Sequence, residues 1–94
     1  MDETNDRRGL IVARLREHFD PLHLDVVDES HLHAGHAGAK SGGGHFRVLI
    51  VSDRFAGEGR IARQRLVYAA LSEAMGPEIH ALSMTTLAPD EWDG

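Results

Sequence analysis

Apolar residues in the first part of the chain recur at the spacing of an amphipathic helix. Ile11, Leu15 and Phe19 fall at positions i, i+4 and i+8, which places them on one helical face. We therefore expect a helix over residues 4–19. The helix is expected to end before Pro21, because the residue that precedes a proline is disfavoured in the α conformation.

Two later segments have the alternating or continuous apolar pattern of β-strands. Residues 22–28 alternate, with Leu22, Leu24 and Val26 on one face. Residues 45–51 are apolar on both faces, which is typical of a central strand. The segment between them, residues 29–44, is rich in histidine and glycine and has little to bury. Connections of this length are uncommon in compact domains, so we expect a mobile loop.

The second half of the chain predicts a helical segment on each side of a glycine-containing turn. A short helical turn is expected over residues 52–55 and a longer helix over residues 60–75. Gly76 and Pro77 are expected to stop the longer helix, because glycine suits its left-handed last residue and proline cannot continue it. The helix positions that we expect to be buried are Ile61, Leu66, Ala69, Ala70 and Ala74.

The chain closes with a third strand and a terminal turn. Residues 78–85 alternate in polarity, and this pattern predicts that His80, Leu82 and Met84 share one face. Residues 89–92 are expected to form a final helical turn, with Trp92 packing back onto the body of the protein.

These elements predict an α+β fold with a three-stranded mixed sheet and helices on one face. The first two strands form a hairpin, and the second and third are joined by helices, which suits a parallel pair with a right-handed crossover. The starts of two adjacent parallel strands lie together. We therefore expect His45, His80 and the histidine-rich loop to meet at one edge of the sheet.

The composition is that of one ordinary globular domain. The 94 residues suffice for a single domain, residues 1–94, with residues 1–5 and 93–94 expected to be flexible. The formal net charge of −5 argues against general affinity for nucleic acid. No apolar run approaches the roughly 18 residues of a membrane span, and the acidic start lacks the apolar stretch of a signal peptide. We expect a cytoplasmic protein without a membrane partner.

The absence of cysteine restricts the metal chemistry that is available to the chain. It excludes disulfides, thiolate metal sites and cysteine nucleophiles. Any metal that the chain holds must use histidine, aspartate, glutamate or an outside ligand. Seven histidines is a high number for this length, and several of them cluster in residues 29–44.

Several short motifs, taken in order, resemble the BolA family. They are Asp28-Glu29-Ser30, Gly44-His45-Phe46-Arg47-Val48, Val51-Ser52-Asp53-Arg54-Phe55, Arg63-Gln64-Arg65-Leu66-Val67-Tyr68, Ile79-His80-Ala81-Leu82 and Pro89-Asp90-Glu91-Trp92. The resemblance covers nearly the whole chain. It implies a small domain related to the class II KH topology, which agrees with the element order above.

The resemblance also implies a partner and a cofactor. BolA-like proteins pair with monothiol glutaredoxins, and a [2Fe–2S] cluster is then bridged by the glutaredoxin cysteine, a glutathione thiol and ligands from the BolA-like chain. The isolated protein is expected to be a monomer without a cofactor. Histidine in place of thiolate raises the potential of such a cluster. An imidazole must be neutral to bind metal, so ligation is sensitive to acid.

Within the resemblance, the histidine of the His-Ala-Leu strand motif is a ligand, which is His80 here. The second ligand comes from the loop between the first two strands, and His33 is the best positional match, counted from Glu29-Ser30. The loop is longer and richer in glycine than in many relatives. His31 and His36 flank His33 and are further candidates, as is His45 at the start of the second strand.

Residues 52–75 carry an alternative function. A short helix, a glycine-containing turn and a longer helix resemble a helix-turn-helix unit, and Arg60, Arg63 and Arg65 are candidates for contacts with DNA phosphates. Some BolA-like proteins are described as transcriptional regulators. Against this, the turn lacks the GXXG sequence of a KH loop, and Glu58 would repel a phosphate. The same arginines are alternatively a surface for glutaredoxin or for the carboxylates of glutathione.

An enzymatic role is not expected. The sequence has no HExxH, GxSxG or P-loop pattern. Ser30 and Ser41 lie near histidines in the sequence, but a mobile glycine-rich loop is a poor scaffold for preorganised chemistry.

Overall fold

The computed structural model describes residues 3–30, 44–76 and 79–94. In chain order the elements are α1 (Glu3–Phe19), β1 (His23–Asp28), β2 (Gly44–Val51), the short 3₁₀ helix η2 (Asp53–Phe55), α3 (Arg60–Ala70), β3 (Ile79–Leu87) and the 3₁₀ helix η3 (Pro89–Glu91). This order is the expected one.

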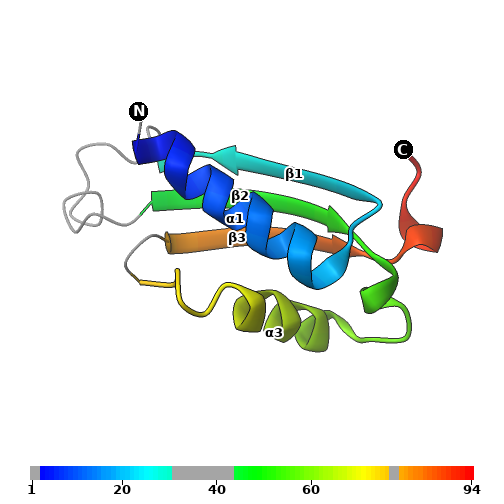
Figure 1. Ribbon diagram of the computed structural model, residues 1–94. Helices are drawn as coiled ribbons and strands as arrows, with labels where there is room; N and C mark the ends of the chain where they lie inside the picture. The colour runs from blue at the N-terminus through cyan, green and yellow to red at the C-terminus, as the bar shows by residue number, and fades with distance from the viewer. Residues whose placement is uncertain (1–2, 31–43, 77–78) are drawn as a thin grey trace.

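The sheet has the strand order β1-β2-β3, with β2 in the centre. β1 pairs with β2 antiparallel, and β2 pairs with β3 parallel. α1 crosses in front of the sheet and α3 runs alongside β3 (Figure 1). The predicted α+β fold with a three-stranded mixed sheet is therefore confirmed.

The core lies between the helices and one face of the sheet. Ile11, Leu15 and Phe19 are buried, so the predicted apolar stripe of α1 is confirmed. They pack with alternate residues of β2, namely Phe46, Val48 and Ile50, in one apolar cluster. Because successive strand residues face opposite sides, the other residues of β2 face away from the helices.

A buried serine ties α1 to the segment that follows β2. The Ser52 hydroxyl is fully buried and donates a hydrogen bond to the carbonyl of Phe19 at 2.8 Å. It also accepts a hydrogen bond from the backbone N–H of Arg54 at 3.1 Å, which caps η2. The rings of Phe19 and Phe55 meet beside it, with their centroids 5.2 Å apart.

The second long helix differs from the prediction in its length and in its buried face. α3 ends at Ala70 rather than at residue 75, and residues 71–74 form turns. The buried positions are Val67, Leu71 and Ala74, whereas Ile61 is 66% exposed. The prediction that Ile61 and Ala69 are buried was wrong, because the core touches the helix along a different stripe.

The third strand differs in its bounds and in which residue begins its buried face. β3 starts at Ile79 and runs to Leu87, two residues beyond the prediction. The register shifts between Gly44 and His45, so Gly44 pairs with Ile79 and His45 with Ala81. Because of this irregularity Ile79 is buried and His80 is exposed. The prediction that His80 shares a face with Leu82 and Met84 was therefore wrong.

The C-terminal segment packs back on the sheet where β1 begins, as predicted for Trp92. Its indole stacks on the His23 imidazole, with ring centroids 4.7 Å apart and an interplanar angle of 22°. The same imidazole lies 3.4 Å from the carboxylate of Asp25. In the part of the chain that the structure describes, none of the helices has the length and apolar character needed to cross a membrane.

Candidate functional site

Two imidazoles meet where the adjacent parallel strands begin. The rings of His45 in β2 and His80 in β3 have centroids 5.2 Å apart and are tilted by 44°. We call this pair the histidine corner. The His80 side chain is exposed, whereas Nε2 of His45 is shielded from solvent. His80 is thus the ring of this pair that an external group can reach.

The histidine corner is positioned by backbone hydrogen bonds at the end of β1. The His45 carbonyl accepts a hydrogen bond from the N–H of Glu29 at 2.7 Å. The His45 N–H donates to the hydroxyl of Ser30 at 3.0 Å, and the Ser30 N–H donates to Asp28 at 2.8 Å. The segment after β1 therefore holds both the backbone N–H and the carbonyl of His45.

An ion pair lies next to this backbone clamp. The Arg47 guanidinium is 2.6 Å from the Glu29 carboxylate, and the two side chains are 64% and 17% exposed. A hollow of about 280 Å³ adjoins it, lined by Glu29, His45, Phe46, Ala81, Leu82 and Ser83. The corner therefore offers an exposed imidazole, a shallow cavity and a pair of opposite charges.

The loop histidines predicted as further ligands, His31, His33 and His36, lie outside the described residues. Among the described residues, no group of three or more histidine, aspartate or glutamate side chains is arranged to hold a metal ion. Metal bound at His80 would therefore need ligands from beyond the described part of this chain.

The three arginines proposed as a common surface have different surroundings. Arg63 contacts Glu91 at 2.6 Å and the carbonyls of Thr86 and Glu58 at 3.0 and 2.9 Å, and its side chain is only 12% exposed. Its hydrogen bonds to Glu91, together with one from the Ala88 N–H, lower the pKa of that carboxyl. Arg63 thus joins α3 to β3 and η3.

Arg60 and Arg65 are exposed. Arg63 was predicted together with these two as a surface for nucleic acid or a partner, but its own contacts are directed at β3 and η3. The pairing with Glu91 spans 28 residues of sequence, so it leaves no local signal.

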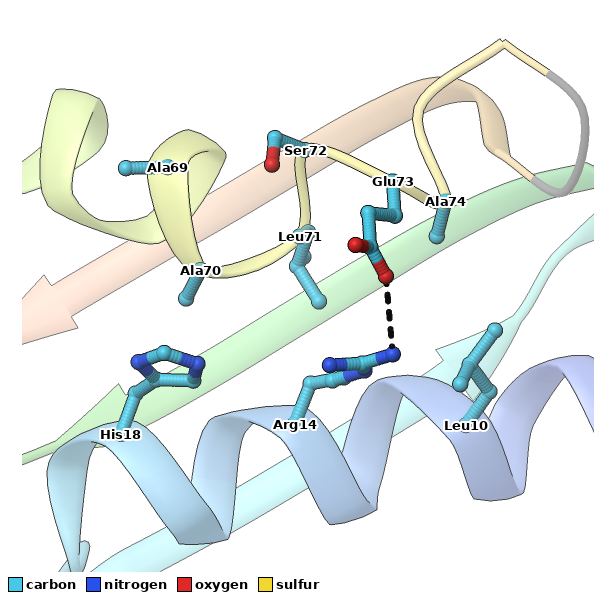
Figure 2. Close-up of a pocket in the computed structure, with 9 residues that line it drawn as sticks. All are labelled: Leu10, Arg14, His18, Ala69, Ala70, Leu71, Ser72, Glu73 and Ala74. Carbon is cyan, nitrogen blue, oxygen red and sulfur yellow. Dashed lines mark hydrogen bonds and ion pairs between the residues drawn. The ribbon is translucent and has the colours of Figure 1, made fainter.

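A second hollow lies between α1 and the segment after α3, away from the histidine corner (Figure 2). Its volume is about 430 Å³. Arg14 of α1 reaches across it to Glu73 at 3.1 Å, and His18 stands one turn further along α1. Of the predicted site residues that the structure describes, none lines this hollow.

Glu29 and Arg47 were missed as site residues in the sequence. Strand alternation could have predicted that Arg47 lies near His45, since residues 45 and 47 of a strand share a face. Glu29 was predicted to lie in the segment between the first two strands, whereas the structure shows its N–H hydrogen-bonded to the carbonyl of His45 in β2.

Comparison with known proteins gives consistent matches over most of the chain. Residues 15–91 match the family described as BolA-like protein. The DNA-binding transcriptional regulator BolA of Escherichia coli is 44% identical over 87 residues, which are 93% of this chain and 80% of the relative. SufE-like protein 1 of Arabidopsis thaliana is 39% identical over 90 residues, 89% of this chain and 24% of that longer protein. The solved BolA domain of SufE1 from the same plant has a TM-score of 0.80 at 38% identity, covering 92% of this chain and 95% of the domain.

Proposed function

The chain belongs to the BolA family, and from that premise we propose that it is a cytoplasmic accessory protein that pairs with a monothiol glutaredoxin. In this role it supplies imidazole ligands to a [2Fe–2S] cluster held jointly with glutathione. It acts as a binding partner in the handling of iron–sulfur clusters and catalyses no reaction of its own. The cluster, when bound, supplies iron for transfer or a redox-sensitive signal.

The observation that carries the proposal is the exposed His80 ring at the histidine corner. Histidine replaces cysteine as a ligand of one iron in some [2Fe–2S] centres, so an imidazole donor fits this group. The chain has no cysteine, and its described residues do not complete a metal site alone. Thiolates from a partner protein and from glutathione would complete the ligand set.

His45 and the hydrogen bonds around it have a supporting role in this proposal. The shielded Nε2 of His45 favours His80 as the ligand and His45 as the ring that packs against it. The fixed backbone at Glu29 and Ser30 starts the segment that leads to His33, His31 and His36, among which we place the second ligand.

The test is anaerobic reconstitution with a monothiol glutaredoxin, glutathione, iron and sulfide, followed by size exclusion and visible circular dichroism. We expect a heterodimer whose spectrum differs from that of the glutaredoxin homodimer. His80→Ala is expected to change that spectrum, whereas the control His18→Ala, an exposed histidine on α1, leaves it unchanged. Separate elution of the two proteins under every condition would refute the proposal.

A second candidate function is DNA-binding regulation, favoured by the name of the Escherichia coli relative. Arg60 and Arg65 are exposed on α3 and are available for phosphate contacts. A titration with duplex DNA at several salt concentrations tests it. Binding that weakens steeply with salt and is reduced in Arg65→Gln would support it.

A further inference from the structure

The outer side of β3 is an open strand edge. The strand order β1-β2-β3 means that β3 pairs with β2 on one side only. The Leu87 carbonyl accepts a hydrogen bond from the Ser52 N–H at 2.9 Å, so the backbone groups of Leu87 point towards β2. Successive residues of a strand point their backbone groups to alternate sides. The backbone groups of Leu82, Met84 and Thr86 therefore point outwards.

Most of this edge lacks the features that usually protect an edge strand. Arg63 donates a hydrogen bond to the Thr86 carbonyl at 3.0 Å and so covers one end of it. The strand itself, Ile79–Leu87, contains no proline and no lysine, arginine, aspartate or glutamate, which are common protecting residues. The opposite edge of the sheet differs, because Arg8 of α1 donates a hydrogen bond to the Val26 carbonyl of β1 at 2.7 Å.

A third hollow, of about 430 Å³, runs along the outer edge of β3. It is lined by residues 84–87 of β3 and, from the α3 side, by residues that include Arg60 and Gln64. Side chains of a strand alternate between the two faces of a sheet, so consecutive residues line a space that lies beside the strand. α3 runs alongside β3 and forms the other wall (Figure 1). We call this hollow the edge groove.

The charges that line the edge groove balance one another. They are those of Arg60, Arg63, Glu58 and Glu91. Arg63 and Glu91 are already paired at 2.6 Å, which leaves one charge of each sign. A balanced set of charges does not attract a polyanion such as nucleic acid. It is compatible with a neutral polymer whose polar groups are hydrogen-bond donors and acceptors, as in a peptide backbone.

We propose that the edge groove binds an extended, uncharged segment of a partner protein, which adds to the sheet as a further strand beside β3. Backbone hydrogen bonds to the outward groups of Leu82 and Met84 supply the affinity. A second copy of this protein fits less well than a single segment, because it would bring its own α3 to an edge along which α3 already runs (Figure 1). The inference goes beyond the proposed function, since it involves neither a cluster nor a histidine ligand.

The test is a titration of the isolated protein with a capped peptide of sequence Thr-Val-Thr-Gln-Thr-Val-Thr, followed by NMR of the backbone amides. The peptide is uncharged and has high β-propensity. We expect the largest shifts at the amides of Leu82, Met84 and Thr86, together with slower hydrogen exchange there. The single-stranded oligonucleotide hexathymidylate is expected to leave these amides unchanged.

Modified peptides distinguish strand addition from other modes of binding. N-methylation of one alternate set of peptide nitrogens removes the N–H groups that face β3, and it is expected to weaken binding at least about tenfold. N-methylation of the other set, which faces away from β3, is expected to leave the affinity nearly unchanged.

Variants of the protein locate the binding site. Gln64→Trp places a large side chain in the edge groove and is expected to abolish the shifts in β3. The matched control is Arg65→Trp, at an exposed position of α3 that does not line the groove, and it is expected to bind the peptide as the native protein does. The dispersion of the amide spectrum verifies that each variant is folded.

Four results of the titrations would overturn the inference: no shifts in β3 at millimolar peptide, equal losses with either N-methylated set, unchanged binding in Gln64→Trp, or shifts in β3 with hexathymidylate in place of the peptide. Shifts of the Leu82 and Met84 amides with protein concentration alone would identify a second copy as the occupant and would also overturn it. None of these results touches the proposed function, because no cluster or glutaredoxin is present. Conversely, failure of the reconstitution with glutaredoxin leaves the peptide titration interpretable.

Discussion

Gly44 begins β2 at a point where the backbone passes directly against two side chains. A Cβ atom at this position would lie 2.6 Å from Cε2 of Phe46, 2.9 Å from the Ser30 hydroxyl and 3.1 Å from Cζ of Phe46. Phe46 is 2% exposed and packs within the core, so its ring cannot turn aside without disturbing its neighbours. We therefore expect Gly44→Ala to destabilise the fold.

The expected loss has two parts. Forcing a methyl group into a packed site costs about 1–3 kcal/mol. Displacing the Ser30 hydroxyl weakens the hydrogen bond that it accepts from the His45 N–H, which is worth about 1 kcal/mol. The sum is about 2–4 kcal/mol, which for a domain of this size lowers the Tm by about 8 °C or more.

Urea unfolding followed by far-ultraviolet circular dichroism measures this loss as a shift of the midpoint at unchanged m-value. Gly9→Ala in α1 is the matched control, because no atom lies within 4 Å of its Cβ position. It is expected to stabilise the protein by about 0.5–1 kcal/mol, since glycine weakens a helix interior.

A double-mutant cycle tests the stated cause. Phe46→Leu removes the ring carbons that the new methyl group meets, so Gly44→Ala is expected to cost at least about 1 kcal/mol less in that background. The reasoning is refuted if Gly44→Ala stays within about 0.5 kcal/mol of the native protein. It is also refuted if the cost is the same in both backgrounds.

Two further predictions concern the hydrogen bonds that tie α1 to η2 and α3 to η3. Ser52→Ala is expected to lower the unfolding free energy measured in urea by about 2 kcal/mol, because two hydrogen bonds of a buried hydroxyl disappear. The control Ser83→Ala, at an exposed serine, is expected to change it little. The Arg63 hydrogen bond lowers the pKa of Glu91 below its ordinary value of 4.5, so this pair stabilises the fold above that pH and the contribution is lost as pH falls through the lowered pKa. Compared between about pH 6 and about pH 3, the unfolding free energy is expected to fall less in Arg63→Gln than in the native protein, and an equal fall in both would contradict the assignment.

The sequence predicted the element order because each element carries its own local pattern. The stripe of Ile11, Leu15 and Phe19 and the apolar alternation of β2 depend only on neighbouring residues. The end of α3 depends on tertiary contacts instead. Residues 71–75 have good helix propensity, but burial of Leu71 and Ala74 and the bridge from Met75 to Ile79 determine their path.

The histidine corner was partly predictable for a topological reason. A parallel crossover brings the starts of β2 and β3 together whatever the side chains are, so the meeting of His45 and His80 follows from strand order. The register irregularity at Gly44 does not follow from strand order. It reverses the expected facing of His80, and only the pairing of the two strands reveals it.

The stack of Trp92 on His23 gives the protein an internal optical reporter. Trp92 is the single tryptophan of the sequence. Its fluorescence depends on its surroundings at the end of the sheet where β1 begins and β2 ends. The histidine corner lies at the opposite end of β2. Indole fluorescence therefore distinguishes two kinds of event without an added label. Unfolding separates the stacked rings and changes the fluorescence, whereas binding of a ligand at the histidine corner alone leaves the fluorescence unchanged.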